Sequence, residues 1–272
     1  MGFTPLYTTE NCKPAYQLRW SLACFLRSSF FLPSAFQEQV SALAEPHGVR
    51  ILEVVQSSDV KFQVLLSSLP NLPPSKIVKL FKGSAQHLLR IECVAKLSRN
   101  FRLVSTGSAN LTAVENYVSG QLEHHPLASP FSMERMRPFS QSFDGVDLSQ
   151  PIQSSHGQYV LGLHLVFVHA QRWRTVNEDF HQKTQAAILA TAKKKQHRIS
   201  RISILPDHTH ITLGFGYQEC PRDIALSYMN NIAFKHEMQP FLMHSYYVGT
   251  IGPYNMSAIR QYLRVEEAAV AG

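Results

Sequence analysis

Hydrophobic and polar positions follow two periods along the chain, and these periods recur in the same order twice. Apolar residues are expected every second position in a half-buried strand and every three to four positions in an amphipathic helix. In the first half this pattern predicts strands at 15–27, 49–57, 59–68 and 100–106, with helices at 31–48, 75–89 and 111–125. In the second half it predicts strands at 159–172, 202–205, 208–213 and 245–250, with helices at 178–195, 221–237 and 255–267.

The end of each half carries the clearest sign of an internal repeat. The segment GSANLTAVENY, which ends at Tyr117, aligns without gaps with GPYNMSAIRQY, which ends at Tyr262. Asp59 lies 58 residues before Tyr117, and Asp207 lies 55 residues before Tyr262. Two copies of one βαββαβα unit explain this agreement, and about 110 to 125 residues is an ordinary domain size.

The stretch between the two copies, 126–157, is rich in proline and serine and has little hydrophobic periodicity. It is predicted to be a linker, so that the chain divides into a domain at 1–125, the linker at 126–157 and a second domain at 158–272. An ordered loop that packs over one half is the alternative.

Composition narrows the class of protein. With 44% apolar and 17% charged residues, each half can bury a core. The net charge of +7 favours a polyanionic partner, and nucleic acid is the first candidate, although a mildly basic protein without such a partner has the same charge. The four cysteines are scattered, which argues against a zinc ribbon or a disulfide framework and fits the cytoplasm. No segment is long enough to span a membrane, and no signal peptide is recognisable.

A pair of histidines stands on one predicted strand. His208 and His210 are two residues apart, so both side chains project from the same face of that strand. Two imidazoles placed in this way can bind a metal ion. The alternative is that they are two half-exposed histidines at a strand edge. His164 is compatible with either a core position or a surface that faces DNA.

Each final helix carries a tyrosine and a polar residue four positions later, Tyr117 with Gln121 and Tyr262 with Glu266. Residues four apart share one helix face, so both members of a pair can point at one site. A tyrosine hydroxyl is a good nucleophile toward phosphorus when a metal polarises the phosphate. A helix tyrosine is more often a packing residue, but here the pair recurs at the same place in both halves.

These features resemble one enzyme family. The strand PDHTHITL, the segment YYVGTIG and the helix AIRQYL are similar to the motifs of the single-tyrosine HUH transposases, which include TnpA-type insertion-sequence enzymes and REP-associated tyrosine transposases. The resemblance covers most of 158–267 and, more faintly, 15–125. Thr209 departs from the bulky hydrophobic residue that the family usually has between the two histidines.

The resemblance implies an α+β fold of two tandem ferredoxin-like or RRM-like domains. It also implies that the two histidines and the glutamine hold Mg²⁺ or Mn²⁺. The metal would polarise a phosphate of single-stranded DNA, typically a hairpin end, and the tyrosine would form a 5′-phosphotyrosine without any nucleotide cofactor. Family members act as homodimers in which the tyrosine helix of one subunit can lie beside the histidines of the other.

This chain is therefore expected to be a fused pseudo-dimer with one metal site, complete as a monomer. Aligning Asp59 with Asp207 places Val60 and Phe62 at the histidine positions, so the first half is expected to lack the histidine pair.

Two arrangements of the single site are open. In the trans arrangement, which recovers the family's full set of ligands, the histidines of the second half combine with Tyr117 and Gln121. In the cis arrangement they combine with Tyr262 and Glu266, whose carboxylate is a competent ligand for a hard cation.

Other functions remain open beside the transposase. A non-catalytic protein that binds nucleic-acid hairpins on the same fold would bind phosphates with an affinity that depends on salt. A replication initiator or relaxase-like nicking enzyme shares the chemistry but usually has a different motif order. A tandem RNA-binding protein would need exposed aromatic residues on its central strands, where this chain has a leucine-rich run instead.

Overall fold

The computed structural model describes residues 4–92, 95–124 and 130–261. Its first half confirms the predicted order of elements, with one predicted strand and one predicted helix each divided in two. The elements are β1 (Lys13–Gln17), β2 (Arg19–Leu26), α1 (Phe36–Ala44), β3 (Val49–Ser58), β4 (Lys61–Ser68), α2 (Pro74–Glu92), β5 (Leu97–Thr106), α3 (Leu111–Ser119) and α4 (Gln121–His124).

The second half repeats the same order after a short connecting region. Its elements are α5 (Pro130–Met136), β6 (Ser140–Ser142), β7 (Ile152–Gln153), β8 (Gly157–Val160), β9 (Gly162–His169), α6 (Glu178–Lys195), β10 (Arg198–Ile204), β11 (His208–Gly214), α7 (Pro221–Lys235) and β12 (Leu242–Ile251). Residues 256–261 form the final helix of the described part of the chain. The fold is α+β, with two tandem ferredoxin-like domains.

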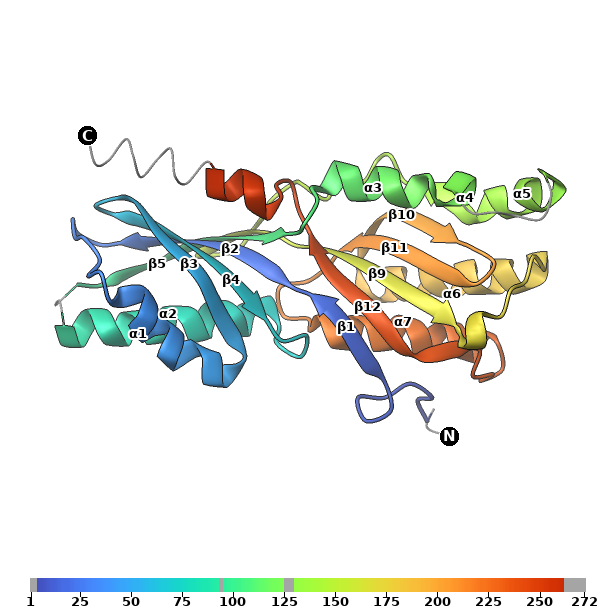
Figure 1. Cartoon of the computed structure of the whole chain (residues 1–272), viewed down its shortest axis with the longest axis horizontal. Coiled ribbons are helices and arrows are strands. Elements are labelled where there is room, and N and C mark those ends of the chain that lie inside the picture. The colour runs from blue at the N-terminus through green and yellow to red at the C-terminus, as the bar shows by residue number, and fades with distance from the viewer. Residues whose placement is uncertain (1–3, 93–94, 125–129, 262–272) are drawn as a thin grey trace.

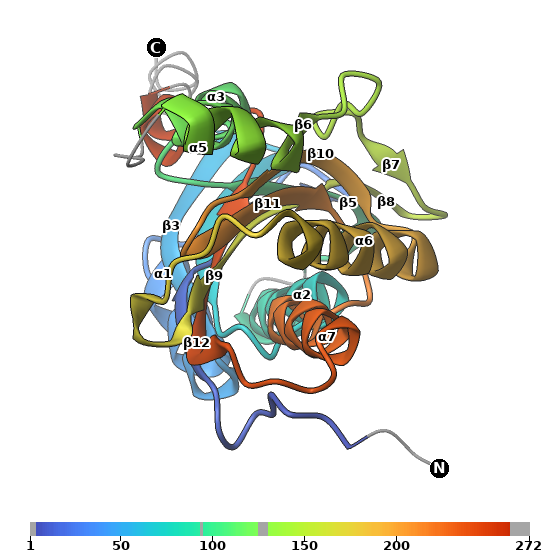
Figure 2. The same cartoon turned by 90° about the vertical axis from the view of Figure 1, so that its right-hand side faces the viewer.

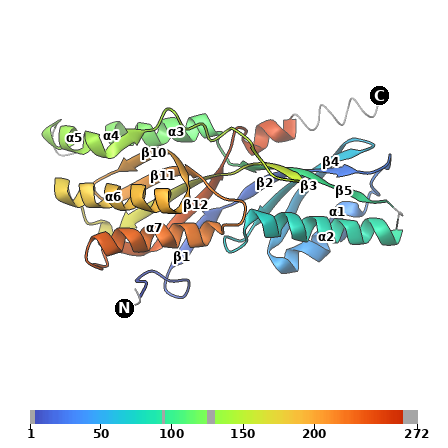
Figure 3. The same cartoon turned by 180° about the vertical axis from the view of Figure 1, so that it is seen from behind.

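The molecule has three layers. Two six-stranded sheets lie end to end along the long axis, with α1, α2, α6 and α7 on one face (Figure 1). The helices α3, α4 and α5 and the helix that starts at residue 256 lie on the opposite face, as the end-on view shows (Figure 2). Seen from behind, α2 and α7 follow one another along the length of the molecule (Figure 3).

One strand from each half passes from its own sheet into the other sheet. The predicted strand at 15–27 is interrupted at Leu18: β1 pairs in parallel with β12, while β2 lies between β4 and β5. The predicted strand at 159–172 is interrupted at Leu161 in the same way: β8 pairs in parallel with β5, while β9 lies between β11 and β12. The two sheets are thus joined by equivalent pairs of strands.

The repeated glycines mark the point where the halves exchange their final helices. The backbone N–H of Leu111 donates to the Gly252 carbonyl at 2.7 Å, and the N–H of Met256 donates to the Gly107 carbonyl at 3.1 Å. A Cβ at Gly252 would lie 1.7 Å from the Ser105 carbonyl oxygen, so only glycine permits this approach. Beyond the crossing, α3 packs on β10 and β11 of the second half.

The segment predicted as a linker contributes ordered elements at 130–153. β6 pairs with β10 and so extends the second sheet, and β7 pairs with β8 at the edge of the first. Leu148 is 1% exposed and packs against Leu111 and Ile251.

The main core lies between the sheets and the four-helix layer. It contains Trp20, Phe62, Leu163 and Phe167, all fully buried. Because side chains alternate along a strand, the residues between these positions face the other layer, where α3 and the final helix pack. Among the described residues, no helix is long and apolar enough to cross a membrane.

Candidate active site

The two predicted histidine ligands lie on the sheet face that α3 covers. His208 and His210 begin β11 directly after the turn at 205–207. Their ring centroids are 4.8 Å apart, with the ring planes at 73°. Both residues are largely buried, with 9% and 4% of their surface exposed. Strand alternation therefore places two imidazoles side by side in a sheltered position.

Neighbouring side chains contact the Nδ1 atom of each histidine. Nδ1 of His208 lies 2.7 Å from a carboxylate oxygen of Asp207, and the other oxygen of that carboxylate lies 3.7 Å from Arg172. Nδ1 of His210 lies 3.0 Å from Nε2 of His164 on β9. A metal would therefore be bound through Nε2 of each ring, because partners at the second nitrogen fix the orientation of a metal-binding imidazole.

Burial determines the charge of His164. Desolvation lowers its pKa from 6.5 to about 4, so the ring is neutral near pH 7. A neutral imidazole has one donor and one acceptor nitrogen. His164 can therefore accept a hydrogen bond from Nδ1–H of His210, which would leave the Nε2 lone pair of His210 directed to a metal.

Tyr117 reaches this position from the other half of the chain. Asn110 caps α3 by accepting a hydrogen bond from the Ala113 N–H at 2.9 Å. The Tyr117 ring packs edge to face against the His210 ring, with ring centroids 5.7 Å apart. The centroids of the Tyr117 and His164 rings are 6.4 Å apart. Because the tyrosine is 52% exposed, its hydroxyl group is accessible to a large substrate.

Gln121 follows Tyr117 across a break in the predicted helix. Gly120 separates α3 from α4, and Gln121 is the first residue of α4. Gln121 is 6% exposed, and its side-chain nitrogen donates to the Tyr117 carbonyl at 3.2 Å. This contact makes its amide oxygen the atom that could act as a ligand.

The donor set tests whether these residues fit a divalent metal. No group of three His, Cys, Asp or Glu side chains that could hold a metal occurs within the described ranges. The third candidate is instead the amide of Gln121. Two imidazole nitrogens and an amide oxygen form a mixed nitrogen and oxygen set that suits a cation of intermediate hardness such as Mn²⁺. The chemistry of this donor set therefore fits a divalent metal.

The residues of the cis arrangement, Tyr262 and Glu266, lie outside the described residues. The described helix at residues 256–261 packs on the first half. Met256 and Ile259 contact Val55 and Leu65, both of the first half. Nε of Arg260 lies 2.9 Å from a carboxylate oxygen of Glu53 on β3.

Strand registers identify the first-half counterparts of the histidines. Arg19 and Gly162 are equivalent, because each pairs with the residue directly before the repeated glycine. Four positions further along β2, the residue paired with it on β4 is Gln63. Four positions further along β9, the residue paired with it on β11 is His210. Gln63 is therefore the counterpart of His210.

The same register makes Lys61 the counterpart of His208 and corrects the sequence alignment. The prediction that Val60 and Phe62 occupy the histidine positions is wrong by one residue. The turn before this strand has two residues in the first half but three, 205–207, in the second. A slip of one residue exchanges the two faces of a strand, and Phe62 accordingly lies in the core.

Sequence reasoning left His164 unassigned and did not single out Tyr247, whose ring centroid lies 5.8 Å from that of His164. The signal for His164 was the alternation of β9, whose leucines at 163 and 165 face the core and leave His164 on the opposite face. Its counterpart in the first half is Ser21, which accepts a hydrogen bond from Gln63. Each half therefore has a cross-strand pair at this place.

Comparisons with known proteins agree with this picture of the second half. Residues 157–266 match the family described as "Transposase IS200 like". No curated protein matches the chain.

Among solved structures, the chain is similar to a protein assigned as a transposase from Deinococcus radiodurans R1, with 20% identity and a TM-score of 0.31 over 39% of this chain and 90% of that one. It is also similar to a REP-associated tyrosine transposase bound to a REP hairpin, with 12% identity and a TM-score of 0.30 over 38% of this chain and 61% of that one. At such low scores these two likenesses carry no argument.

The family match spans the elements from β8 to the final helix and includes both histidines. The resemblance seen in the sequence is therefore confirmed for residues 157–266, which match the IS200-like transposase family.

Proposed function

We propose that the chain is a metal-dependent enzyme that cleaves and rejoins single-stranded DNA at one composite site. Tyr117 is the nucleophile, and His208, His210 and Gln121 are the metal ligands. The observation that carries this proposal is the contact of the Tyr117 ring with His210, which brings together residues from opposite halves. The family match of the second half and the net charge of +7 support DNA as the substrate.

The reaction is a transesterification at phosphorus. The Tyr117 Oη attacks the scissile phosphate, so that an O–P bond to tyrosine forms while the P–O3′ bond breaks. The 3′ oxygen leaves as a hydroxyl after taking up a proton, and the half-exposed phenol can lose its own proton to water. Attack by another 3′-OH reverses the step and joins a new strand, and no nucleotide cofactor is needed because the phosphotyrosine retains the bond energy.

The protein side chains prepare this site. A bound divalent metal would supply Lewis-acid polarisation of the phosphate. Asp207 orients the His208 imidazole, and His164 orients the His210 imidazole. The hydrogen bond from Gln121 to the Tyr117 carbonyl links the third ligand to the helix that carries the nucleophile.

A covalent-adduct assay tests the proposal. Wild type would be incubated with labelled single-stranded hairpin DNA from the flanks of its gene and Mn²⁺, and denaturing gels would reveal any protein–DNA adduct. We expect an adduct with wild type and none with Tyr117→Phe, which lacks the nucleophilic oxygen. Tyr254→Phe is the matched control, since Tyr254 is also exposed but lies outside the site.

A non-catalytic hairpin-binding protein is the second candidate. It is favoured by the first half, where Lys61 and Gln63 occupy the positions of the histidines, so the first half lacks the two imidazole ligands. Hairpin binding by wild type without an adduct on any flanking sequence, in Mg²⁺ or Mn²⁺, would establish this candidate.

The fused halves also lead us to propose that one chain suffices. Each half supplies a part that the other lacks, as the two subunits of a dimer would. Sedimentation of the chain with and without hairpin DNA tests this, and a monomer bound to one hairpin is the expected species.

A further inference from the structure

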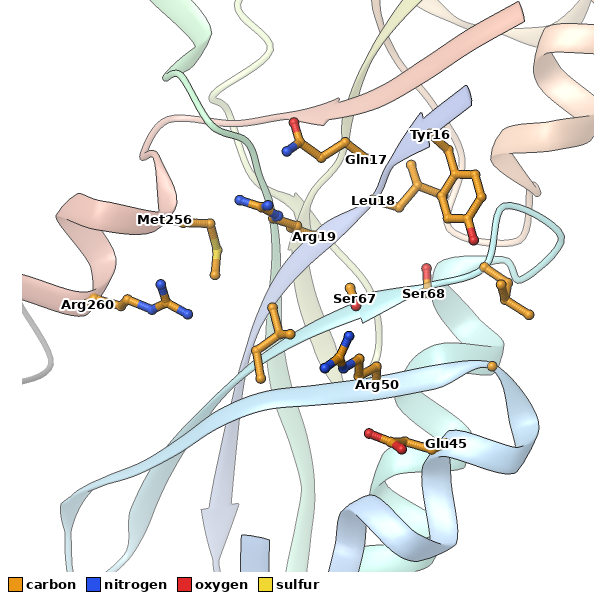
Figure 4. Close-up of a pocket in the computed structure, with 13 residues that line it drawn as sticks. Tyr16, Gln17, Leu18, Arg19, Glu45, Arg50, Ser67, Ser68, Met256 and Arg260 are labelled. Atoms are coloured by element: carbon orange, nitrogen blue, oxygen red, sulfur yellow. The ribbon is translucent and has the colours of Figure 1, made fainter. Parts of the chain in front are cut away.

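A pocket of about 730 Å³ lies on the first half, on the same sheet face as the final helix. It is bordered by the strands β1 to β4 and by the helix that starts at residue 256 (Figure 4). Its volume is within the range of ligand sites. Nothing in the proposed cleavage reaction uses it.

Three arginines line this arginine pocket, namely Arg19, Arg50 and Arg260, against one acidic residue, Glu45. Arg260 extends from its helix toward the strands that carry the other two (Figure 4). Nε of Arg260 is held by Glu53 at 2.9 Å. Within the described ranges, no carboxylate pairs with the guanidinium group of Arg19 or Arg50. Guanidinium groups bind phosphate through paired N–H donors, so the pocket suits phosphate oxygens.

The side of the pocket that has no arginine is apolar and can contact a nucleobase. Tyr16 is 44% exposed and lines the pocket together with Leu52 and Leu69. Aromatic side chains beside a positively charged groove are the usual means of binding single-stranded nucleic acid, because bases stack on the ring while cations contact the backbone. A free phosphate would make no use of this apolar wall.

The second half shows why the pocket is open. Strand pairing makes Arg198 the counterpart of Arg50, and Gly214 the counterpart of Ser67. There, a guanidinium nitrogen of Arg198 donates to the Asp147 carbonyl at 3.3 Å, and Leu148 fills the space above Gly214. No described segment covers the equivalent place in the first half, so the pocket there is open, whereas Leu148 and Asp147 occupy its counterpart in the second half.

The arginine pocket adjoins the candidate active site. A smaller pocket of about 300 Å³ is lined by Tyr117, His164 and Tyr247, and it shares Gln17 with the arginine pocket. Burial raises the pKa of the Tyr247 phenol, and the nearby charge of Arg19 partly opposes this shift, which places Arg19 beside this smaller pocket. A strand that leaves the nucleophile along this face therefore meets the arginines next.

We propose that the arginine pocket binds the phosphate backbone of single-stranded DNA that flanks the cleavage position, with one base against Tyr16. This inference rests on the proposed function for the identity of the ligand. It adds to that function a second contact region, supplied by the half that lacks the histidine pair.

Binding of an oligonucleotide in EDTA tests the proposal without requiring cleavage. The affinity of the full chain for a fluorescent thirty-residue oligo(dT) would be measured by anisotropy over a range of salt concentrations. The double variant Arg19→Gln/Arg50→Gln is compared with Lys79→Gln/Arg90→Gln, which removes the same charge from exposed positions on α2. Thermal unfolding of both variants checks that each is folded.

We expect the pocket variant to bind about tenfold more weakly at low salt. The slope of log K against log salt should fall by about 1.4, since each lost phosphate contact on a single strand accounts for about 0.7. Tyr16→Ala should lose about fivefold in affinity at all salt concentrations, because stacking is lost rather than charge. The α2 control should retain the wild-type slope.

Equal losses of affinity and slope in the two double variants would overturn the proposal. A second outcome would also overturn it: inorganic tripolyphosphate binds through the two arginines, but their removal leaves oligonucleotide binding unchanged. The ligand of the pocket would then be a free polyanion. The binding assay contains EDTA and does not require cleavage, so its outcome is independent of the adduct assay. Arginine-dependent binding in EDTA, together with no Tyr117 adduct in Mn²⁺, would contradict the proposed function but not the proposed binding site.

Discussion

Replacement of His164 by alanine tests how the site holds its metal ligand. The ring of His164 stacks on that of His210 with centroids 5.2 Å apart, and the two rings share a 3.0 Å contact between Nε2 and Nδ1. The alanine side chain cannot provide this contact. Nδ1 of His210 would then lose its partner in a position where the residue is only 4% exposed.

Two effects of different size follow. A buried polar atom that loses its partner costs about 1 to 3 kcal/mol in unfolding free energy. Loss of a residue that orients a metal ligand lowers metal affinity about 10-fold to 100-fold. We therefore expect the Mn²⁺ concentration needed for half-maximal adduct formation to rise by about that factor, with a smaller change in the yield at saturating Mn²⁺.

The assay is a Mn²⁺ titration of adduct formation at 25 °C, at saturating hairpin DNA. His164→Gln should recover part of the loss, because an amide can accept the same hydrogen bond. His87→Ala, on the exposed face of α2, is the control and should match wild type. The reasoning is refuted if His164→Ala forms adduct with the wild-type dependence on Mn²⁺ while its melting temperature is lowered.

Three further predictions concern the fold. Gly252→Ala should lower the unfolding free energy, measured by urea titration, by about 3 kcal/mol or more, because its Cβ would lie 1.7 Å from a backbone oxygen. Gly83→Ala on α2, where a Cβ meets nothing within 4 Å, is the control and should be neutral or stabilising. Equal effects of the two variants would contradict the close crossing of the halves at Gly252. Asn110→Ala should cost about 1 kcal/mol by loss of the α3 cap, measured by the same titration; no change in stability would count against the cap. Burial lowers the pKa of His169 to about 4, so the folded state binds fewer protons than the unfolded state below pH 6.5, and stability falls as the pH drops from 6.5 toward 4. The melting temperature of His169→Phe should fall less over that range than that of wild type. An unchanged pH profile would contradict this assignment.

The sequence predicted most elements of the fold because their faces differ clearly in polarity. Alternation located β9 and β11, and the repeat that ends at Tyr117 and Tyr262 located the two halves. It did not show that a single extended run divides between two sheets, because the apolar alternation continues through Leu18 and Leu161 without interruption. Pairing partners, rather than local pattern, determine where such a strand changes sheets.

The candidate site was predicted in part. Both histidines and Tyr117 could be named, because the repeat points to the tyrosine and the spacing points to the histidines. The first-half positions were misplaced by one residue, because aligning the two aspartates assumed turns of equal length. The role of His164 depends on a neighbouring strand, so its own sequence environment does not reveal it.

Identification of the tyrosine that carries the DNA tests the composite site most directly. The covalent adduct formed by wild type would be digested with nuclease and trypsin, and the nucleotide-modified peptide identified by mass spectrometry. The peptides 103–135 and 261–264 each contain one tyrosine, Tyr117 and Tyr262 respectively. Modification of Tyr117 is the predicted result. Modification of Tyr262 alone would contradict the composite site, because the nucleophile would then belong to the same half as the histidines.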